Sequence, residues 1–184
     1  MKNKIMSVAL ALLMALSFTA CGEKDDSSTT DNKSSSVATS DKGFSFAESA
    51  DWKDDSASNS SVACLYRYNG NSTNAYAKLT ASVNVVEIPI GNSKLSDIVD
   101  MLKAQYTTLT QDYKVSDPVS TTFLNYEAAE INIEISDAEV SMALKQIVFI
   151  DNGTAYAISY GAEKTAFTDL AAEFKAFIET FKVG

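Results

Sequence analysis

The side chains that most often carry out catalysis are scarce in this chain of 184 residues. It has no histidine, which removes the commonest general base and the commonest metal ligand. Neither a Ser-His-Asp or Cys-His arrangement nor an HExxH zinc site can therefore form. Arg67 is the only arginine, so a bidentate clamp for phosphate or carboxylate would lack its usual donor. The S-x-x-K, G-x-S-x-G and P-loop motifs are absent as well. We therefore predict a non-catalytic protein without cofactor or metal.

Two groups of carboxylates could still do chemistry. Glu130 and Glu134 fall on the same face of a predicted strand, about 13–14 Å apart by the rise per residue, which exceeds the usual spacing of catalytic pairs. Asp51, Asp54 and Asp55 are close in sequence but lack the D-x-[DN]-x-[DN]-G register of a calcium loop. We interpret the first group as a solvated face and the second as a charged loop.

A cysteine and the tyrosines complete the candidates. Cys64 lies between Ala63 and Leu65 in a predicted strand, which favours a small buried side chain over the alternative of a reactive thiol. The eight tyrosines are numerous enough to line a glycan or peptide groove, although we interpret them as core and rim residues. They are Tyr66, Tyr68, Tyr76, Tyr106, Tyr113, Tyr126, Tyr156 and Tyr160.

The start of the chain has the pattern of an export signal. Lys2 and Lys4 precede an apolar run over residues 5–16, which is too short for a comfortable membrane span and suits a signal peptide. Phe18-Thr19-Ala20-Cys21 resembles the lipobox of bacterial lipoproteins, with Phe18 where that motif usually has leucine. The resemblance implies cleavage after residue 20 and a diacylglyceryl thioether on Cys21. The alternative is an ordinary secretory signal that contains a cysteine.

A polar tract follows Cys21 and ends where the folded domain is expected to begin. Residues 22–41 contain no aromatic residue and a single β-branched aliphatic residue, Val37, so they cannot bury enough surface to offset the entropy of ordering. Twenty such residues reach on the order of 25 Å. We therefore predict a signal peptide over 1–20, a lipidated cysteine with a flexible linker over 21–42, and one domain over 43–184.

The charge of the chain limits its partners. Once Lys2 and Lys4 are removed with the signal, 13 basic residues face 24 acidic ones, which gives a net charge of −11. Such a chain is repelled by nucleic acid phosphates and by anionic lipid headgroups. We therefore expect no nucleic acid partner, and we expect the lipid on Cys21 alone to hold the protein at the outer face of the bacterial cell membrane.

The last forty residues carry the strongest structural signals. Residues 144–150 and 155–160 are predicted strands, and the Asn152-Gly153 pair between them favours a type I′ hairpin turn. A helix is predicted to follow, because apolar residues recur three and four apart. Its stripe consists of Phe167, Leu170, Ala171, Phe174, Phe177, Ile178 and Phe181.

The preceding residues predict further strands and a second helix. The strands are expected over 44–46, 62–68, 79–88, 120–123 and 129–135, and the helix over 94–109 with Asn92 or Ser93 as its cap. The apolar stripe of this helix consists of Leu95, Ile98, Val99, Leu102, Tyr106 and Leu109. The apolar alternation in 79–88 changes phase at Val86, which indicates either a bulge or a strand covered on both faces. The predicted class is α+β, with two main helices packed on a mostly antiparallel sheet.

In this order of elements the chain resembles the PsbP/Mog1-like fold. Four stretches carry the resemblance: Phe46 with Trp52, Pro89-Ile90-Gly91, residues 124–128, and residues 155–160 with the helix that follows. Asn125 stands where such domains often have glycine, which is a departure at the turn before residues 126–128. The resemblance implies a non-enzymatic role, since such domains bind photosystem or GTPase partners or are small bacterial lipoproteins.

Two functions of different classes are compatible with these observations. The first is a membrane-tethered module that binds a protein or another component of the cell envelope. The second is a lipoprotein that binds a small ligand, such as a receptor associated with a transporter. A deep apolar pocket with convergent polar groups would favour the ligand, and a flat exposed patch would favour the partner.

Overall fold

The computed structural model describes residues 43–107, 112–136 and 140–184. The predicted signal peptide (1–20) and the predicted linker (21–42) lie outside the described residues, as does Leu109 of the predicted helical stripe. Within the described ranges no helix is long and apolar enough to cross a membrane. All strands and helices named below belong to the predicted domain.

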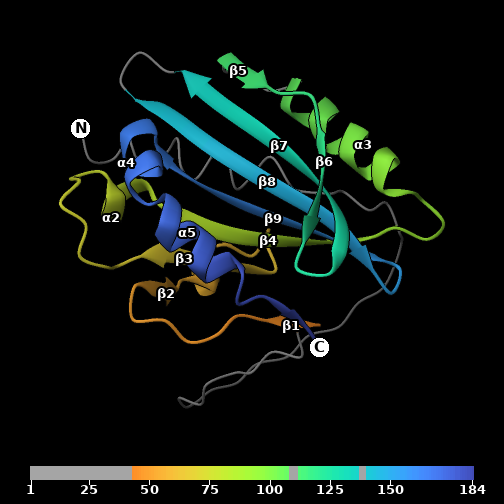
Figure 1. The fold of residues 1–184 in the computed structure, drawn as a ribbon, viewed down its shortest axis with the longest axis horizontal. Coiled ribbons are helices and arrows are strands. Elements are labelled where there is room, and N and C mark those ends of the chain that lie inside the picture. The colour runs from red at the N-terminus through yellow and green to blue at the C-terminus, as the bar shows by residue number, and fades with distance from the viewer. Residues whose placement is uncertain (1–42, 108–111, 137–139) are drawn as a thin grey trace, which may run out of the picture.

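An antiparallel sheet forms the centre of the domain (Figure 1). Its strands follow the order β2-β3-β4-β9-β8-β7-β5, and β6 also pairs with β7. They are β2 (Trp52–Asp54), β3 (Cys64–Tyr68), β4 (Ser82–Pro89), β5 (Asp112–Val115), β6 (Val119–Phe123), β7 (Tyr126–Ser136), β8 (Ser141–Asp151) and β9 (Thr154–Glu163). Two short strands, β1 (Phe44–Ser45) and β10 (Lys182–Val183), pair separately and bring the start of the domain beside its end.

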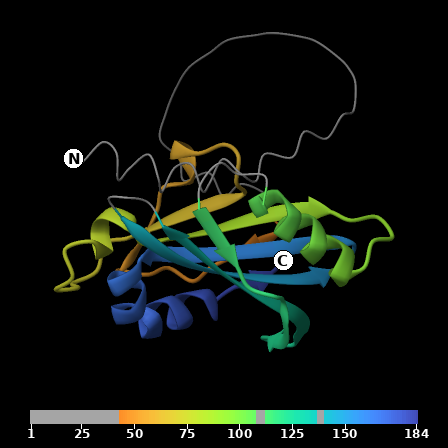
Figure 2. The same cartoon turned by 90° about the horizontal axis from the view of Figure 1, so that it is seen from above.

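Helices cover both faces of this sheet, as Figure 2 shows. The helix α3 (Leu95–Thr107) lies on one face, and α4 (Lys164–Asp169) with α5 (Ala171–Ile178) lies on the other. The short α2 (Ala77–Thr80) and the 3-10 turn η1 (Ser56–Ser58) lie in the connections beside β3. Each face has its own buried apolar cluster, aliphatic under α3 and largely aromatic under α4 and α5. The α+β class with helices on an antiparallel sheet is therefore confirmed.

The predicted hairpin joins the two central strands. Asp151 pairs with Thr154, and the two residues between them have positive φ, at 45° for Asn152 and 79° for Gly153. Both residues of a type I′ turn need positive φ, which asparagine and glycine adopt at low cost. The turn prediction is confirmed, and it fixes the register of β8 against β9.

The predicted C-terminal helix is divided in two. It begins at Lys164, three residues before the first member of the predicted stripe, and the carboxylate of Glu163 accepts hydrogen bonds from the N–H groups of Thr165 (2.9 Å) and Ala166 (3.2 Å). Leu170 lies between the two helices as the C-cap of α4 and the N-cap of α5. The break follows Thr168 and Asp169, both weak helix formers.

The phenylalanine stripe nevertheless packs as predicted. Phe174, Phe177 and Phe181 are buried in the aromatic cluster, and Phe167 is half-buried beside it. Phe181 lies in the turn after α5 rather than within the helix. The stripe therefore forms the contact between the C-terminal helices and the sheet.

The strand predicted over 79–88 is wrong at its beginning. Thr80 belongs to α2, Leu79 is 49% exposed, and β4 starts at Ser82. The change of phase comes from burial on both faces: Val83 and Val85 join the aromatic cluster, whereas Val86 and Ile88 join the aliphatic one. Pairing with β9 runs without interruption, so the alternative of a bulge is excluded.

The helix predicted over 94–109 is α3. Its residues Ile98, Val99, Leu102 and Tyr106 are buried against the sheet, as the predicted stripe requires. The first turn is closed by Asp97, whose Oδ2 accepts the N–H of Lys94 at 2.9 Å. The cap expected at Asn92 or Ser93 is wrong, because α3 begins at Leu95 and Lys94 therefore occupies the cap position, where its C=O accepts the N–H of Ile98.

Candidate functional site

The two glutamates that the sequence singles out do not form a catalytic pair. Ile131, Ile133 and Ile135 alternate with them and are buried on the α3 face, so Glu130 and Glu134 lie on the opposite face. Glu130 pairs with Lys145 at 2.8 Å and Glu134 with Lys164 at 3.3 Å. Each carboxylate is thus occupied by its own lysine, as expected for a solvated face.

The aspartate-rich loop is tied to the sheet by the single arginine. Arg67 Nε donates to Asp55 Oδ2 at 2.6 Å, while Asp54 accepts hydrogen bonds from Ser56 and Asp51 is exposed. Partial burial acts to raise the pKa of the Asp55 carboxyl, but hydrogen bonds from Arg67 and Ser58 outweigh it and hold this pKa below its ordinary value. Over residues 43–107, 112–136 and 140–184, no three histidine, cysteine, aspartate or glutamate residues gather in a way that could hold a metal ion.

Cys64 and the tyrosines take largely structural positions. Cys64 is 1% exposed within the aromatic cluster, which confirms its interpretation as a small buried side chain. Three tyrosines are buried, four are half-buried, and Tyr76 alone among the eight is exposed. The buried ones are Tyr68, Tyr106 and Tyr156, and the half-buried ones are Tyr66, Tyr113, Tyr126 and Tyr160. They line the core and its rim, and Tyr106 and Tyr113 also line a hollow at the end of α3.

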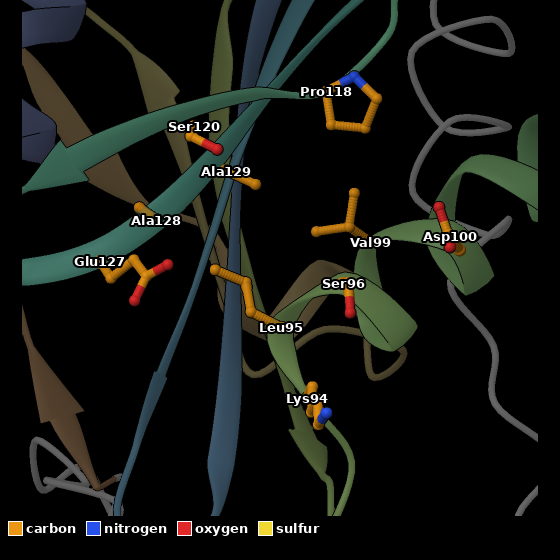
Figure 3. Close-up of a pocket in the computed structure, with 10 residues that line it drawn as sticks. All are labelled: Lys94, Leu95, Ser96, Val99, Asp100, Pro118, Ser120, Glu127, Ala128 and Ala129. Atoms are coloured by element: carbon orange, nitrogen blue, oxygen red, sulfur yellow. The ribbon is translucent and has the colours of Figure 1, made fainter.

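A groove of about 460 Å³ lies between the first half of α3 and the β6–β7 hairpin (Figure 3). Its apolar lining comes from Leu95 and Val99 on α3, Pro118 before β6, and Ala128 and Ala129 on β7. Its polar rim consists of Lys94, Ser96, Asp100, Ser120 and Glu127. We call this hollow the α3–β6 groove; none of its lining residues was identified from the sequence as a candidate.

The position of β6 depends on a break in the strand that precedes it. β5 and β6 pair in succession with the same side of β7, and residues 116–118 separate them. At the break Ser116 N–H donates to Asn132 O at 2.9 Å, while Asn132 N–H donates to Ser116 Oγ at 3.0 Å. The hydroxyl therefore takes the place of a backbone carbonyl. An ion pair of 2.6 Å between Lys103 and Asp117 ties the break to α3.

The hairpin itself exposes apolar side chains. Val119 is 57% exposed and Leu124 is 39% exposed, whereas Phe123 is buried and contacts Phe149 with ring centroids 5.6 Å apart. Leu124 has φ 53°, a left-handed conformation that costs a non-glycine residue roughly 1–2 kcal/mol. In the turn that contains Asn125, the residue with positive φ is therefore the exposed Leu124.

Comparison with known proteins identifies the fold. Neither a family model nor a curated protein sequence matches the chain. Among solved structures, CyanoP, the PsbP of the cyanobacterium Synechocystis sp. PCC 6803, superposes with a TM-score of 0.54 at 10% identity, covering 77% of this chain and 87% of CyanoP. LpqN, involved in cell envelope biogenesis of Mycobacterium tuberculosis, gives a TM-score of 0.52 at 11% identity, covering 76% of this chain and 82% of LpqN.

A third structure, the protein of unknown function PA94 from Pseudomonas aeruginosa, gives a TM-score of 0.53 at 9% identity, with 63% of this chain and 80% of PA94 covered. At these identities the likeness concerns the fold alone. The domain therefore has a PsbP/Mog1-like fold, as the sequence resemblance predicted.

Proposed function

We propose that this protein is a non-catalytic module, held at the outer face of a bacterial cell membrane by lipid on Cys21, that binds a protein of the cell envelope. The observation that carries this proposal is the β6–β7 hairpin, which borders the α3–β6 groove and exposes Val119 on the opposite face of the sheet and Leu124 at its turn. Exposed apolar side chains next to a hollow are typical of binding surfaces. The role of LpqN in envelope biogenesis is compatible with this proposal.

The chemistry of the groove supports binding rather than catalysis. Its three charged side chains are Lys94, Asp100 and Glu127, and within the described part of the chain none of them forms an ion pair with another. The hydroxyl of Ser96 donates to Asp97 Oδ1 only at 3.4 Å, and the other oxygen of this carboxylate accepts the backbone N–H of Lys94, so the contact is long for a preassembled catalytic pair. The groove therefore offers shape and charge but no assembled reactive group.

A second candidate function, binding of a small ligand, is favoured by a separate hollow of about 610 Å³. It lies at the other end of α3 and is lined by Tyr106 and Tyr113 together with Lys103 and Lys114. Aromatic rings beside two amines would suit a small anionic ligand. We place this candidate second because the same hollow is also lined by the carboxylate of Glu134, and because Lys103 is already paired with Asp117 at 2.6 Å.

Attachment to the membrane is tested at Cys21. Cells that express the full chain and take up an acyl probe should label the wild-type protein and leave Cys21→Ala unlabelled, because the thioether forms only on that thiol. Fractionation should then recover the wild type with membranes, since each buried methylene of the lipid adds roughly 0.8 kcal/mol to membrane affinity. Equal labelling of both chains would contradict the proposed anchor.

Binding is tested with the exposed hairpin. We expect the double variant Val119→Thr/Leu124→Asn to capture its partner from detergent-solubilised envelope about tenfold less than wild type, equivalent to about 1.4 kcal/mol. The same variant should fold at least as stably, because asparagine tolerates positive φ better than leucine. Leu79→Asn is the matched control, because Leu79 is an exposed leucine on α2, at the end of the domain remote from β6 (Figure 1).

The same preparations also test the absence of catalysis. We expect no turnover in esterase, peptidase, phosphatase and glycosidase assays. Reproducible turnover that disappears when one groove residue is changed would contradict the proposed function, and so would undiminished capture by the double variant.

A further inference from the structure

We infer that the partner binds by adding an extended strand to the free edge of β6, and that this strand alternates basic and apolar residues. The inference rests on the proposed function and specifies the chemistry of the partner. It follows from the direction of the backbone groups of β6, from the lack of charge along that edge, and from what lies on each face beside it.

The backbone of β6 has polar groups directed away from the sheet. The backbone N–H and C=O groups of Asn132 both point to the edge of β7 that pairs with β5 and β6. Alternate residues of a strand point their backbone groups the same way, so the residues two and four positions earlier in β7 also bond toward this edge. Those residues, Glu130 and Ala128, stand opposite Val119 and Thr121. The alternate residues Ser120 and Thr122 therefore turn their N–H and C=O groups to the outer edge. No described strand pairs with that edge.

Beyond Pro118, which directly precedes β6, the edge lacks the features that usually prevent further pairing. Natural edge strands are commonly protected by charged side chains, by bulges or by a covering element. The outermost strands β2 and β5 carry charge, with Lys53 on one and Lys114 on the other, whereas β6 has the uncharged sequence VSTTF. Its five residues span about 17 Å, enough to pair with a short extended segment.

The two faces beside β6 differ in what they offer an added strand. Ser120 and Thr122 lie on the α3 face, where the rim of the groove carries two carboxylates, Glu127 on β7 and Asp100 on α3, and one amine, Lys94. An added strand would be on the order of 10 Å from β7. A lysine of that strand and Glu127 of β7 can meet across this distance when both side chains are extended. On the opposite face the neighbours are Val119, Thr121 and Phe123, which favour an apolar side chain.

Charge distinguishes this partner from a second copy of the chain. Residues 43–184 contain 19 acidic and 10 basic residues, a net charge of −9. A second β6 would bring no basic side chain to Glu127 and Asp100, and it would bring another acidic domain with it. A basic extended segment of another protein would pair with the outward backbone groups of β6 and bring positive charge to Glu127 and Asp100.

The test uses residues 21–184 carrying Cys21→Ala and a capped peptide of eight residues, lysine and valine in alternation. We expect this peptide to bind at least tenfold more tightly than the matched glutamate–valine peptide, measured by fluorescence anisotropy at low salt. Thr122→Pro should weaken binding of the lysine peptide at least tenfold, because it removes one outward N–H while leaving the bonds to β7 intact. Thr122→Val is the matched control, since it retains the N–H.

Urea unfolding establishes that each variant folds. If Thr122→Pro does not fold, a lysine–valine peptide that is N-methylated along one edge takes its place, and it should bind at least tenfold more weakly to the wild-type chain. Equal binding of the peptides of opposite charge, no binding of either, or binding that is insensitive to both changes would overturn the inference. If the envelope partner is no longer captured by Val119→Thr/Leu124→Asn but is still captured by Thr122→Pro, strand addition is refuted. The proposed function is not contradicted by that outcome.

Discussion

Replacing Phe174 or Phe181 by alanine should lower the free energy of unfolding by about 3–5 kcal/mol. Both side chains are almost completely buried, with exposures of 1% and 2%. Each substitution removes the transfer free energy of a whole ring and leaves a cavity, because closely packed neighbours relax only in part. A domain of ordinary stability has about 5–15 kcal/mol in total, so either change would be severe.

The two rings join different elements to the sheet. Phe174 on α5 contacts Trp52 and Tyr160, with ring centroids 5.1 Å and 5.3 Å away. Phe181 stacks on Phe44 of β1 at 5.3 Å and meets the edge of Phe149 at 5.7 Å. Losing Phe181 should therefore loosen the pairing of β1 with β10 as well as the core.

Urea unfolding of residues 21–184 with Cys21→Ala measures these losses. Phe167→Ala is the matched control: it lies on the same stripe but is only half-buried, and it should lose clearly less. A loss below about 1 kcal/mol at both Phe174 and Phe181 would mean that the aromatic cluster does not support the fold.

The parts of this architecture that the sequence predicts are those fixed by short-range patterns. Spacings of three and four placed the aromatic stripe of the last helix, and the Asn152-Gly153 pair placed the central hairpin, because both signals act within a few residues. The division of the helix at Leu170 was not predicted, since the apolar period continues through it. The helical turn before β4 was not predicted either, because Leu79 fits a strand alternation although it is exposed.

The α3–β6 groove depends on contacts between residues distant in the sequence. Leu95 and Val99 belong to a helical stripe whose period predicts only that they face the sheet, and Pro118 and Ala129 come near them through the pairing of β6 with β7. Leu124 has positive φ because Phe123 pairs with Tyr126, which leaves two residues to close the turn. No local preference of leucine indicates such a conformation.

The buried tyrosines predict how stability depends on pH. Burial raises the pKa of Tyr66 to about 12, and the neighbouring Cys64 and Asp54 act in the same direction. Burial also raises the pKa of Tyr106, although a hydrogen bond with Gln146 partly opposes it, and burial raises the pKa of Tyr160 as well. In the unfolded chain a tyrosine titrates at about 10. The folded protein therefore holds these phenols in their neutral form at pH values where the unfolded chain releases their protons.

This difference makes the fold sensitive to alkali. The stability associated with a raised tyrosine pKa is fully present below pH about 10 and is lost as the pH rises through the folded pKa, because only the unfolded state releases the proton readily in that interval. We expect urea midpoints that stay level between about pH 6 and 8, where histidine would normally titrate and this chain has none, and that fall steadily from about pH 10 to 12.

Tyr106→Phe is the matched variant for this effect. It removes one deeply buried phenol, so the decline of the midpoint with pH should be shallower than in the wild type, whatever the stability at pH 7. Absorbance at 295 nm should show this titration together with unfolding rather than before it. A midpoint that remains level through pH 12 would mean that these hydroxyls are exposed to water, in contradiction to the packing of α3 and α5 on the sheet.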